Sequence, residues 1–194
     1  MARLTGAVPG ERVLDVAAGT GNSTLALAKY GATVVSSDFT ISMLNIAHSK
    51  FKQKRVENRI LGLVGADAQN LPFKNSSFDA VTICYGIRNL EQRAIAYAEF
   101  RRVLKPGGRL VILEFSTPQW GWIRWLYNLY SQFFLVKLGG LLSGNPLAYT
   151  YLRESIKSFP SQPVLARELQ SAGYFDVSWQ NLSFGIVALH MGRA

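Results

Sequence analysis

An aspartate followed by a loop of small residues forms the pattern in this sequence that points most directly to chemistry. Asp15 lies in the apolar run Val13-Leu14-Asp15-Val16, and the loop Ala17-Ala18-Gly19-Thr20-Gly21 follows at once. Glycine reaches the positive φ that a sharp turn demands, and alanine and glycine place little side chain between the backbone and a ligand. The pattern therefore predicts close contact with a nucleotide-like ligand, at Asp15, Ala17, Gly19 and Gly21.

The same loop lacks the signatures of two common nucleotide sites. No Lys-Ser or Lys-Thr pair follows the glycines, as a phosphate-binding loop for ATP requires, and the spacing is not Gly-x-Gly-x-x-Gly. The pattern argues against ATP and weakens the case for NAD.

Asp38 supplies a second carboxylate. It ends the apolar run of residues 32–37, about where a doubly wound α/β fold places the acid that hydrogen-bonds ribose hydroxyls. Because Asp15 and Asp38 would end neighbouring strands, the pair suits a ligand that carries both a ribose and a positive charge. S-adenosylmethionine has both features, so we expect it as the cofactor.

Strand and helix patterns alternate along the chain around this loop, as in doubly wound α/β folds. The apolar runs predict seven strands, at residues 13–16, 32–37, 61–65, 78–83, 109–115, 175–179 and 185–190. Helical spacing predicts helices at residues 24–28, 41–51, 91–104 and 162–172. We therefore expect one domain over residues 1–194, built on a mostly parallel seven-stranded sheet.

Residues 119–160 interrupt this alternation after the fifth strand, and we expect them to form a substrate-pocket insert. Their first part carries large apolar side chains at helical spacing: Trp120, Ile123, Tyr127, Tyr130 and Phe134. The spacing predicts a helical aromatic insert over the carboxyl edge of the sheet, where ligands bind in open α/β folds. Burial against the sheet is one role for it; lining an apolar substrate pocket or touching a membrane interface is the alternative.

The formal net charge of +9 suits an anionic partner. Lysine and arginine are spread along the chain, with one cluster at residues 50–55, and no nucleic-acid-binding motif accompanies them. That cluster fits a solvated helix end. We therefore expect no nucleic acid as a partner, and we consider peripheral contact of the basic surface and the aromatic insert with a membrane.

The cellular setting follows from cysteine usage and hydropathy. Cys84 is the single cysteine, which excludes an internal disulfide and agrees with a reducing compartment. Neither a signal peptide nor an apolar run long enough to span a membrane is visible. We expect a cytoplasmic protein at the inner face of the membrane.

Several motifs together resemble the class I S-adenosylmethionine-dependent methyltransferases. The glycine loop, Asp38, Asp67-Ala68-Gln69-Asn70-Leu71-Pro72-Phe73 and Leu104-Lys105-Pro106-Gly107-Gly108 are shared by many of these enzymes. Four others are similar to the ubiquinone/menaquinone biosynthesis C-methyltransferases: Tyr85-Gly86-Ile87-Arg88-Asn89, Leu113-Glu114-Phe115-Ser116, residues 149–156 and Val187-Ala188-Leu189-His190. The resemblance covers nearly the whole chain and implies a Rossmann-like fold.

This resemblance implies a set of cofactor contacts and a reaction. The implied contacts lie at Thr20, Asp38, Asp67, Ala68 and Cys84. The implied reaction transfers a methyl group to a ring carbon of a demethylated, prenylated quinol, either demethylmenaquinol or a related benzoquinol. A sulfonium is already electrophilic, so we expect no metal ion.

The amino-terminal segment departs from the family pattern. Members of that family carry a longer segment before the first strand than the twelve residues that precede Val13 here. We therefore expect a shortened amino terminus and weaker cofactor binding.

Methylation at carbon needs an electron-rich ring, which loss of a proton from a neighbouring quinol hydroxyl provides. We expect Arg88 to stabilise a phenolate or orient a water, Asn89 to position the same groups, and Tyr151 to bind a quinol oxygen. Structural alternatives stay open: an ion pair for Arg88, a helix cap for Asn89 and core packing for Tyr151.

Three further residues are alternatives for proton transfer or quinol binding. Glu114 ends the fifth strand, Tyr149 alternates with Tyr151, and His190 has an ordinary pKa that suits acid–base work. Because His190 falls on what we expect to be an edge hairpin, we favour a structural role for it.

Other functions and assemblies remain open from the sequence. One alternative is a methyltransferase for another lipid, such as a sterol or a phospholipid. Another is a non-catalytic protein that binds S-adenosylmethionine, which the short amino terminus suggests. A homodimer is an alternative to the monomer.

Overall fold

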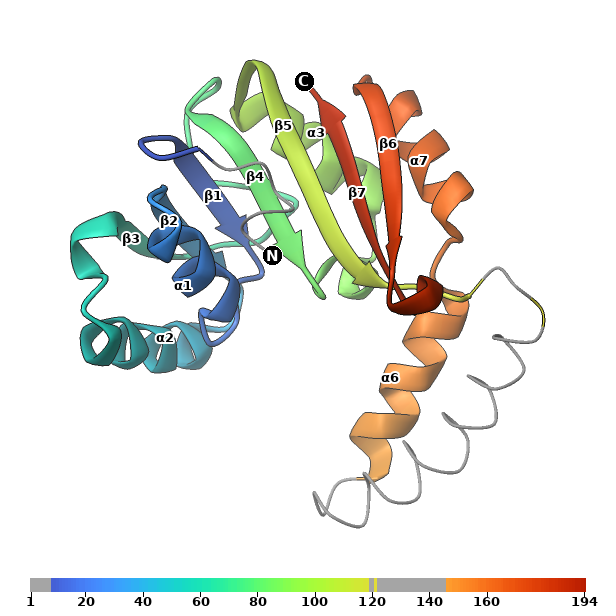
Figure 1. Cartoon of the computed structure of the whole chain (residues 1–194), viewed down its shortest axis with the longest axis horizontal. Helices are drawn as coiled ribbons and strands as arrows, with labels where there is room; N and C mark the ends of the chain where they lie inside the picture. The colour runs from blue at the N-terminus through green and yellow to red at the C-terminus, as the bar shows by residue number, and fades with distance from the viewer. Residues whose placement is uncertain (1–7, 119–120, 122–145) are drawn as a thin grey trace.

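The computed structural model of the chain describes residues 8–118, 121 and 146–194. They contain a seven-stranded sheet in the order β3-β2-β1-β4-β5-β7-β6 (Figure 1). Its strands are β1 Arg12–Val16, β2 Thr33–Asp38, β3 Ile60–Gly65, β4 Phe78–Cys84, β5 Leu104–Phe115, β6 Phe175–Leu182 and β7 Val187–Arg193. Strands β1 to β5 pair in parallel, whereas β7 runs antiparallel between β5 and β6. The prediction of a mostly parallel α/β sheet is confirmed.

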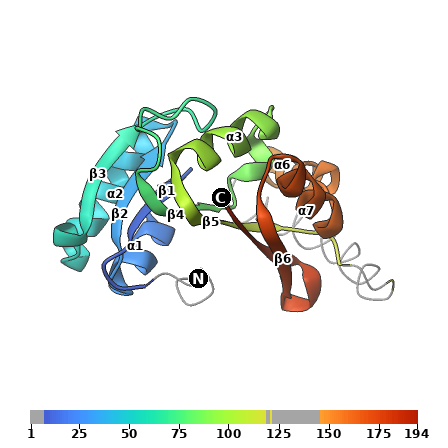
Figure 2. The same cartoon turned by 90° about the horizontal axis from the view of Figure 1, so that it is seen from above.

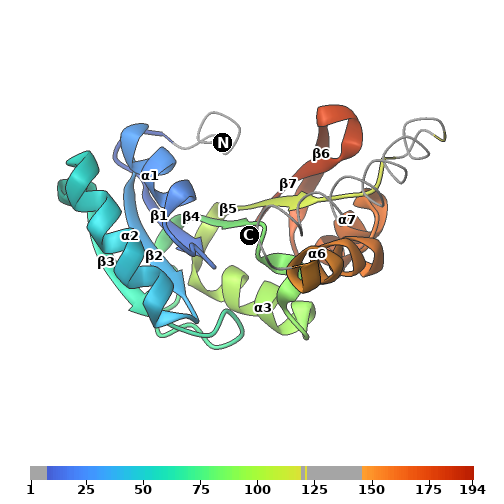
Figure 3. The same ribbon diagram turned by 90° about the horizontal axis from the view of Figure 1, so that it is seen from below.

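Helices connect the strands and lie on both faces of the sheet. They are α1 Asn22–Lys29, α2 Ile41–Lys54, α3 Arg93–Val103, α6 Pro146–Ser158 and α7 Gln162–Ser171, with short 3-10 turns η1 Glu57–Arg59, η2 Ile87–Asn89 and η4 Ser183–Gly185. Figures 2 and 3 show α1 and α3 on opposite sides of the sheet. Helix α6 lies beyond the carboxyl ends of the parallel strands (Figure 1).

The alternation of side chains along β1 explains the two helical layers. Successive residues of a strand point to opposite faces. Leu14 and Val16 join the cluster that includes Tyr97 of α3. Val13 instead joins the cluster that includes Phe51 of α2. From Val13 to Val16 the strand is therefore buried on both faces, and its loop emerges at the edge of the sheet.

Strand β5 begins five residues earlier than the sequence predicts, at Leu104 rather than Arg109. In the sequence, the Lys-Pro-Gly-Gly motif at residues 105–108 lies between the predicted helix and the predicted strand. Instead Leu104 pairs with Phe78, and the Gly107 amide donates to the carbonyl of Ala194 at 2.7 Å. Backbone partners on neighbouring segments thus extend the strand through its glycines.

Of two further expectations about the carboxyl-terminal half, one is confirmed and one is wrong. Strands β6 and β7 form the hairpin expected at the edge of the sheet, and His190 lies on its inner strand, β7. Tyr149 and Tyr151 lie on helix α6 and not on a strand, so the strand-like alternation expected for them is wrong.

Most of the aromatic part of the predicted 119–160 insert lies outside the described residues, and its predicted helix stays a prediction. Residues 146–158 of that insert form α6. Within the described ranges, no helix is long and apolar enough to cross a membrane.

Candidate functional site

A cavity of about 480 Å³ lies where the parallel strands β1, β2 and β4 end. Its lining includes five of the residues predicted from the sequence, namely Ala17, Asp38, Asp67, Ala68 and Asn89. The carboxyl edge of an open α/β sheet is the usual ligand site, because loops from several strands meet there. We take this cavity as the candidate functional site.

Asp38 holds two segments of the cavity wall together. Its Oδ2 accepts a hydrogen bond from the Gly19 amide at 2.7 Å, and its Oδ1 accepts one from the Thr40 amide at 2.8 Å. A carboxylate has about four lone-pair sites, so both oxygens can accept further bonds from ribose hydroxyls. The residue thereby ties the glycine loop to the start of α2 and still fits a ribose.

Gly21 in the glycine loop and Gly86 after β4 leave no room for a larger side chain. Gly21 has a φ of 78°, and a Cβ there would lie 2.5 Å from Cζ of Phe51. Gly86, after β4, would place a Cβ 2.6 Å from Cβ of Ala17. The loops after β1 and β4 therefore touch, and the backbone forms the cavity wall that a nucleotide-like cofactor such as S-adenosylmethionine requires.

Asp15 does not line this cavity. Its side chain is fully buried and accepts hydrogen bonds from the hydroxyls of Ser23, Thr24 and Thr82 at 2.6, 2.6 and 2.9 Å. Burial raises the pKa of Asp15, and the three hydroxyls oppose that shift. The carboxylate joins β1 to α1 and β4, and its predicted direct contact with the cofactor stays a prediction.

Lys50 departs from the solvated helix end predicted for residues 50–55. Its ammonium donates to the carbonyl oxygen of Thr20 at 2.6 Å, to the Thr20 hydroxyl at 3.2 Å and to Oδ1 of Asn22 at 2.8 Å. Helix α2 is thereby hydrogen-bonded to the glycine loop through Lys50. No spacing in the sequence connects Lys50 with Thr20, so this contact could not be predicted.

Cys84 ends β4 beside the cavity but does not line it. The side chain packs against the apolar cluster of Val111, Leu113 and Leu189. Burial is the main cause that raises the pKa of Cys84, so the thiol stays protonated. The cofactor contact predicted at Cys84 stays a prediction.

Arg88 and Glu114, two separate candidates in the sequence, are partners of each other. Arg88 Nη1 lies 2.6 Å from Glu114 Oε1, with side chains 11% and 1% exposed. Arg88 Nη1 also donates to the carbonyl of Tyr85 at 2.6 Å. Burial raises the pKa of Glu114 above its ordinary value, while the Arg88 charge opposes that shift. The ion pair that was the structural alternative for Arg88 is present.

Asn89 and Tyr151 meet at the rim of the cavity. The Tyr151 hydroxyl donates to Oδ1 of Asn89 at 3.2 Å, which connects α6 with η2. Tyr151 is 61% exposed, so the core-packing alternative for it is wrong. The structure thus brings together two of the three residues predicted to take part in catalysis.

His190 lies away from the cavity. Its ring is buried and stacks on Trp179, and Nε2 lies 3.1 Å from the carbonyl oxygen of Gln162. Burial lowers the pKa of His190, so the ring is neutral near pH 7. The structural role favoured from the sequence agrees with this position, although the strand is internal.

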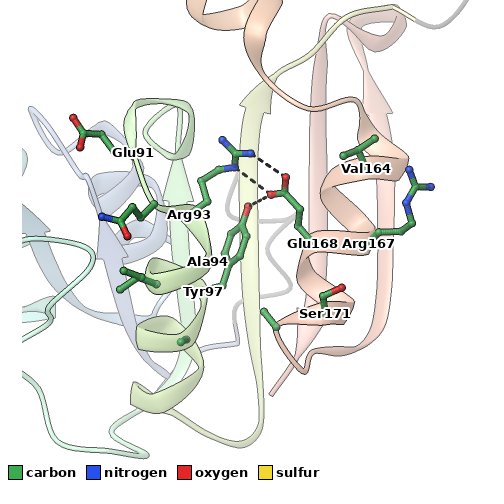
Figure 4. A pocket seen from close by; sticks show the side chains of 12 residues that line it. Glu91, Arg93, Ala94, Tyr97, Val164, Arg167, Glu168 and Ser171 are labelled. Atoms are coloured by element: carbon green, nitrogen blue, oxygen red, sulfur yellow. Dashed lines mark hydrogen bonds and ion pairs between the residues drawn. The ribbon is translucent and has the colours of Figure 1, made fainter.

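A second cavity, of about 990 Å³, lies between α3 and α7 (Figure 4). Arg93 reaches across it to Glu168 at 2.9 Å, and the Tyr97 hydroxyl donates to the same carboxylate at 3.1 Å. None of the site residues predicted from the sequence lines it. The polar side chains of this cavity bind one another and join α3 to α7. The volume of a cavity alone therefore does not identify the functional site.

Comparison with solved structures supports the fold. The chain is similar to a SAM-dependent methyltransferase from Aquifex aeolicus, with a TM-score of 0.67 at 18% identity over 98% of this chain and 85% of that one. It is also similar to the [4+2]-cyclase SpnF, with a TM-score of 0.73 at 19% identity over 99% of this chain and 77% of that one. Because one of these neighbours is a cyclase, such likeness shows the fold and leaves the reaction to other observations.

Comparison with curated sequences is more specific. The chain is 48% identical to a demethylmenaquinone methyltransferase of Beutenbergia cavernae, over 97% of this chain and 75% of that protein. It is 44% identical to one of Streptomyces avermitilis, over 99% of this chain and 80% of that protein. The sequence model of the ubiE/COQ5 methyltransferase family matches residues 1–194. The chain therefore belongs to the ubiE/COQ5 methyltransferase family.

Proposed function

We propose that this protein transfers a methyl group from S-adenosylmethionine to a ring carbon of demethylmenaquinol in menaquinone biosynthesis. The observation that carries this proposal is the 48% identity, over 97% of the chain, with a relative named demethylmenaquinone methyltransferase. We expect the reaction to take place in the cavity at the carboxyl edge of the sheet.

The β1–β2 side of the cavity would bind the cofactor. Asp38 accepts the ribose hydroxyls, Asp67 and Ala68 border the base, and Ala17, Gly19 and Thr20 provide the close backbone. When bound, S-adenosylmethionine supplies an electrophilic methyl group on a positively charged sulfur. The role of this chain is to hold the reacting atoms in line and to keep water from them.

The β4–η2 side would bind the quinol. Oδ1 of Asn89 already accepts the Tyr151 hydroxyl, which leaves the Asn89 amide hydrogens for a quinol oxygen. Arg88 is too basic to accept a proton, so it would steady the phenolate electrostatically while a water takes the proton. Glu114 fixes the Arg88 guanidinium in place. The ring carbon would then gain the methyl group, and its own proton would pass through water to the quinol oxygen, so that one proton is released overall.

The direct test is a methyl-transfer assay on the purified chain. Reduced demethylmenaquinol and S-adenosylmethionine with a deuterated methyl group are incubated with the protein, and the product is analysed by mass spectrometry. We expect the quinone to gain one labelled methyl group. A folded chain that binds S-adenosylhomocysteine but never labels this quinol would contradict the proposal.

The same assay separates the alternative substrates. A demethylated benzoquinol replaces the naphthoquinol in one arm, and extracted sterols and phospholipids replace it in another. Preferred labelling of the naphthoquinol supports the proposal. Preferred labelling of another lipid would favour that lipid as substrate, and cofactor binding without any product would favour a non-catalytic role.

We further propose that the protein contacts the membrane peripherally, because a prenylated quinol resides there. The net charge of +9 and the aromatic residues of the predicted insert support this. Liposome flotation tests it, with anionic against neutral vesicles and wild type against Trp122→Ala and Trp125→Ala. Equal recovery in every arm would exclude this role for the two tryptophans. Sedimentation velocity of the wild-type protein without vesicles tests the homodimer that the sequence leaves open.

A further inference from the structure

Tyr85 occupies a strained and firmly held position beside the cavity. It follows directly after β4 and has a φ of 56°, a conformation that is strained for a residue other than glycine. Its amide donates to the carbonyl of Leu113 at 2.8 Å, and its carbonyl accepts from Arg88 at 2.6 Å. The surrounding structure therefore enforces this conformation at both backbone groups.

The ring of Tyr85 is also placed. Its centroid lies 4.7 Å from that of Phe115, and the guanidinium carbon of Arg88 lies 5.5 Å from the same Phe115 ring. Phe115 follows Glu114, the partner of Arg88. The Arg88–Glu114 ion pair and the contact with Phe115 thus orient the ring of Tyr85. This ring lines the cavity next to Asn89.

The Tyr85 hydroxyl remains available within this arrangement. The residue is 38% exposed, and in the part of the chain that the structure describes its hydroxyl has no hydrogen-bond partner. Burial raises the pKa of Tyr85, so the group stays protonated and can donate at neutral pH. A phenylalanine would make the same ring contact, so packing does not require the oxygen.

We propose that Tyr85 binds the acceptor substrate by donating its hydroxyl hydrogen to an oxygen of the quinol ring. This inference rests on the function proposed above and adds a substrate-binding residue to it. Tyr85 and Asn89 border the same cavity, so their two donors can act on the same ring. A donor aimed at a developing phenolate is stronger than one aimed at a neutral oxygen, so it favours the activated quinol.

The test replaces the hydroxyl alone. In Tyr85→Phe we expect kcat/KM for demethylmenaquinol to fall by at least about tenfold, because the lost hydrogen bond is one to a charged group. The Kd for S-adenosylhomocysteine, measured by calorimetry, and the thermal unfolding midpoint should not change. A structural role would move the unfolding midpoint and the cofactor affinity as well.

The control is Ser178→Ala, which removes an exposed hydroxyl on β6, outside the cavity lining. It should leave all three measurements at their wild-type values. Wild-type kcat/KM in Tyr85→Phe would overturn the inference, as would a fall accompanied by an equal loss of cofactor affinity. Failure of the wild-type protein to methylate demethylmenaquinol would instead overturn the proposed function.

Discussion

The two sides of the cavity differ in how their polar groups are satisfied. On the β1–β2 side, polar groups bind one another: Asp15 accepts three hydroxyls, Asp38 accepts two amides, and Lys50 donates to three oxygens of the loop region. On the β4–η2 side, the Arg88–Glu114 pair is buried, but Tyr85, Asn89 and Tyr151 at its surface are exposed. Between Asn89 and Tyr151 there is one hydrogen bond.

We expect this difference to give the two sides different roles, one in affinity for the cofactor and the other in turnover. A side whose donors and acceptors are already oriented loses little conformational entropy when its ligand binds, which favours affinity. A side whose exposed donors await a partner gains interactions when the acceptor forms its charge, which favours the transition state. Changes on the β1–β2 side should therefore alter cofactor binding, and changes at the surface of the β4–η2 side should alter turnover.

The largest expected effect concerns the buried pair below the β4–η2 surface. Arg88→Met leaves the Glu114 carboxylate buried without its cation, so we expect the free energy of unfolding to fall by about 3–5 kcal/mol. Urea unfolding at pH 7 measures it. The matched control is Arg153→Met, whose side chain is more exposed and whose nearest carboxylate oxygen, on Glu154, lies 3.7 Å away. That change should cost less than about 0.5 kcal/mol.

The pH dependence sharpens this prediction. Because burial raises the pKa of Glu114, the ionised group costs stability, and this cost is absent below the unfolded-state pKa and grows as the pH rises toward the folded-state value. Removing Arg88 takes away the charge that opposes the shift. The difference between wild type and Arg88→Met should therefore be larger at pH 7 than at pH 4.5. An equal difference at both values would show that Glu114 is not ionised in the pair.

The next largest effect tests the β1–β2 side. Asp38→Ala removes the acceptor of two backbone amides and the proposed ribose contact, so we expect the Kd for S-adenosylhomocysteine to rise by at least about 100-fold, or ~2.7 kcal/mol. Titration calorimetry measures it, with Glu57→Ala as an exposed acidic control outside the cavity lining. Unchanged affinity in Asp38→Ala would remove the assignment of this side to the cofactor.

A smaller effect concerns the support of the glycine loop. Lys50→Met removes three hydrogen bonds to the loop region, and water can replace part of them, so we expect unfolding to cost about 1 kcal/mol less and cofactor affinity to fall about fivefold. Lys54→Met changes the same charge on the same helix at an exposed position and should do neither. Equal behaviour of the two variants would mean that the loop keeps its shape without Lys50.

The fold and the strand-end residues could be predicted because local patterns determine them. Apolar runs and the Gly-x-Gly loop define the strands, and parallel strands place their carboxyl ends together. Asp38 and Asp67 therefore reach one cavity although they are far apart in sequence. Ala17 and Asn89 also come shortly after strands, and they line the same cavity.

Contacts that depend on how elements pack could not be predicted. Arg88 and Glu114 were proposed separately, since their pairing depends on the adjacency of β4 and β5. The contact of Lys50 with Thr20 depends on how α2 lies against the loop. The early start of β5 depends on backbone partners at the carboxyl terminus. Each of these contacts joins segments that meet only in the folded chain. The local sequence around either partner therefore does not predict it.

The smallest expected effect lies at the exposed rim. Tyr151→Phe removes a hydrogen bond of 3.2 Å to Asn89 where water competes for both partners, so kcat/KM for the quinol should fall only about threefold, with unchanged stability and cofactor affinity. Steady-state kinetics measures it, and Asn89→Ala is the informative companion. If Tyr151 acts only by orienting Asn89, adding Tyr151→Phe to Asn89→Ala lowers kcat/KM no further. A tenfold fall in the single variant, or additive losses in the double variant, would mean that Tyr151 binds the quinol directly, and the β4–η2 side would then include α6 as a second substrate-binding element.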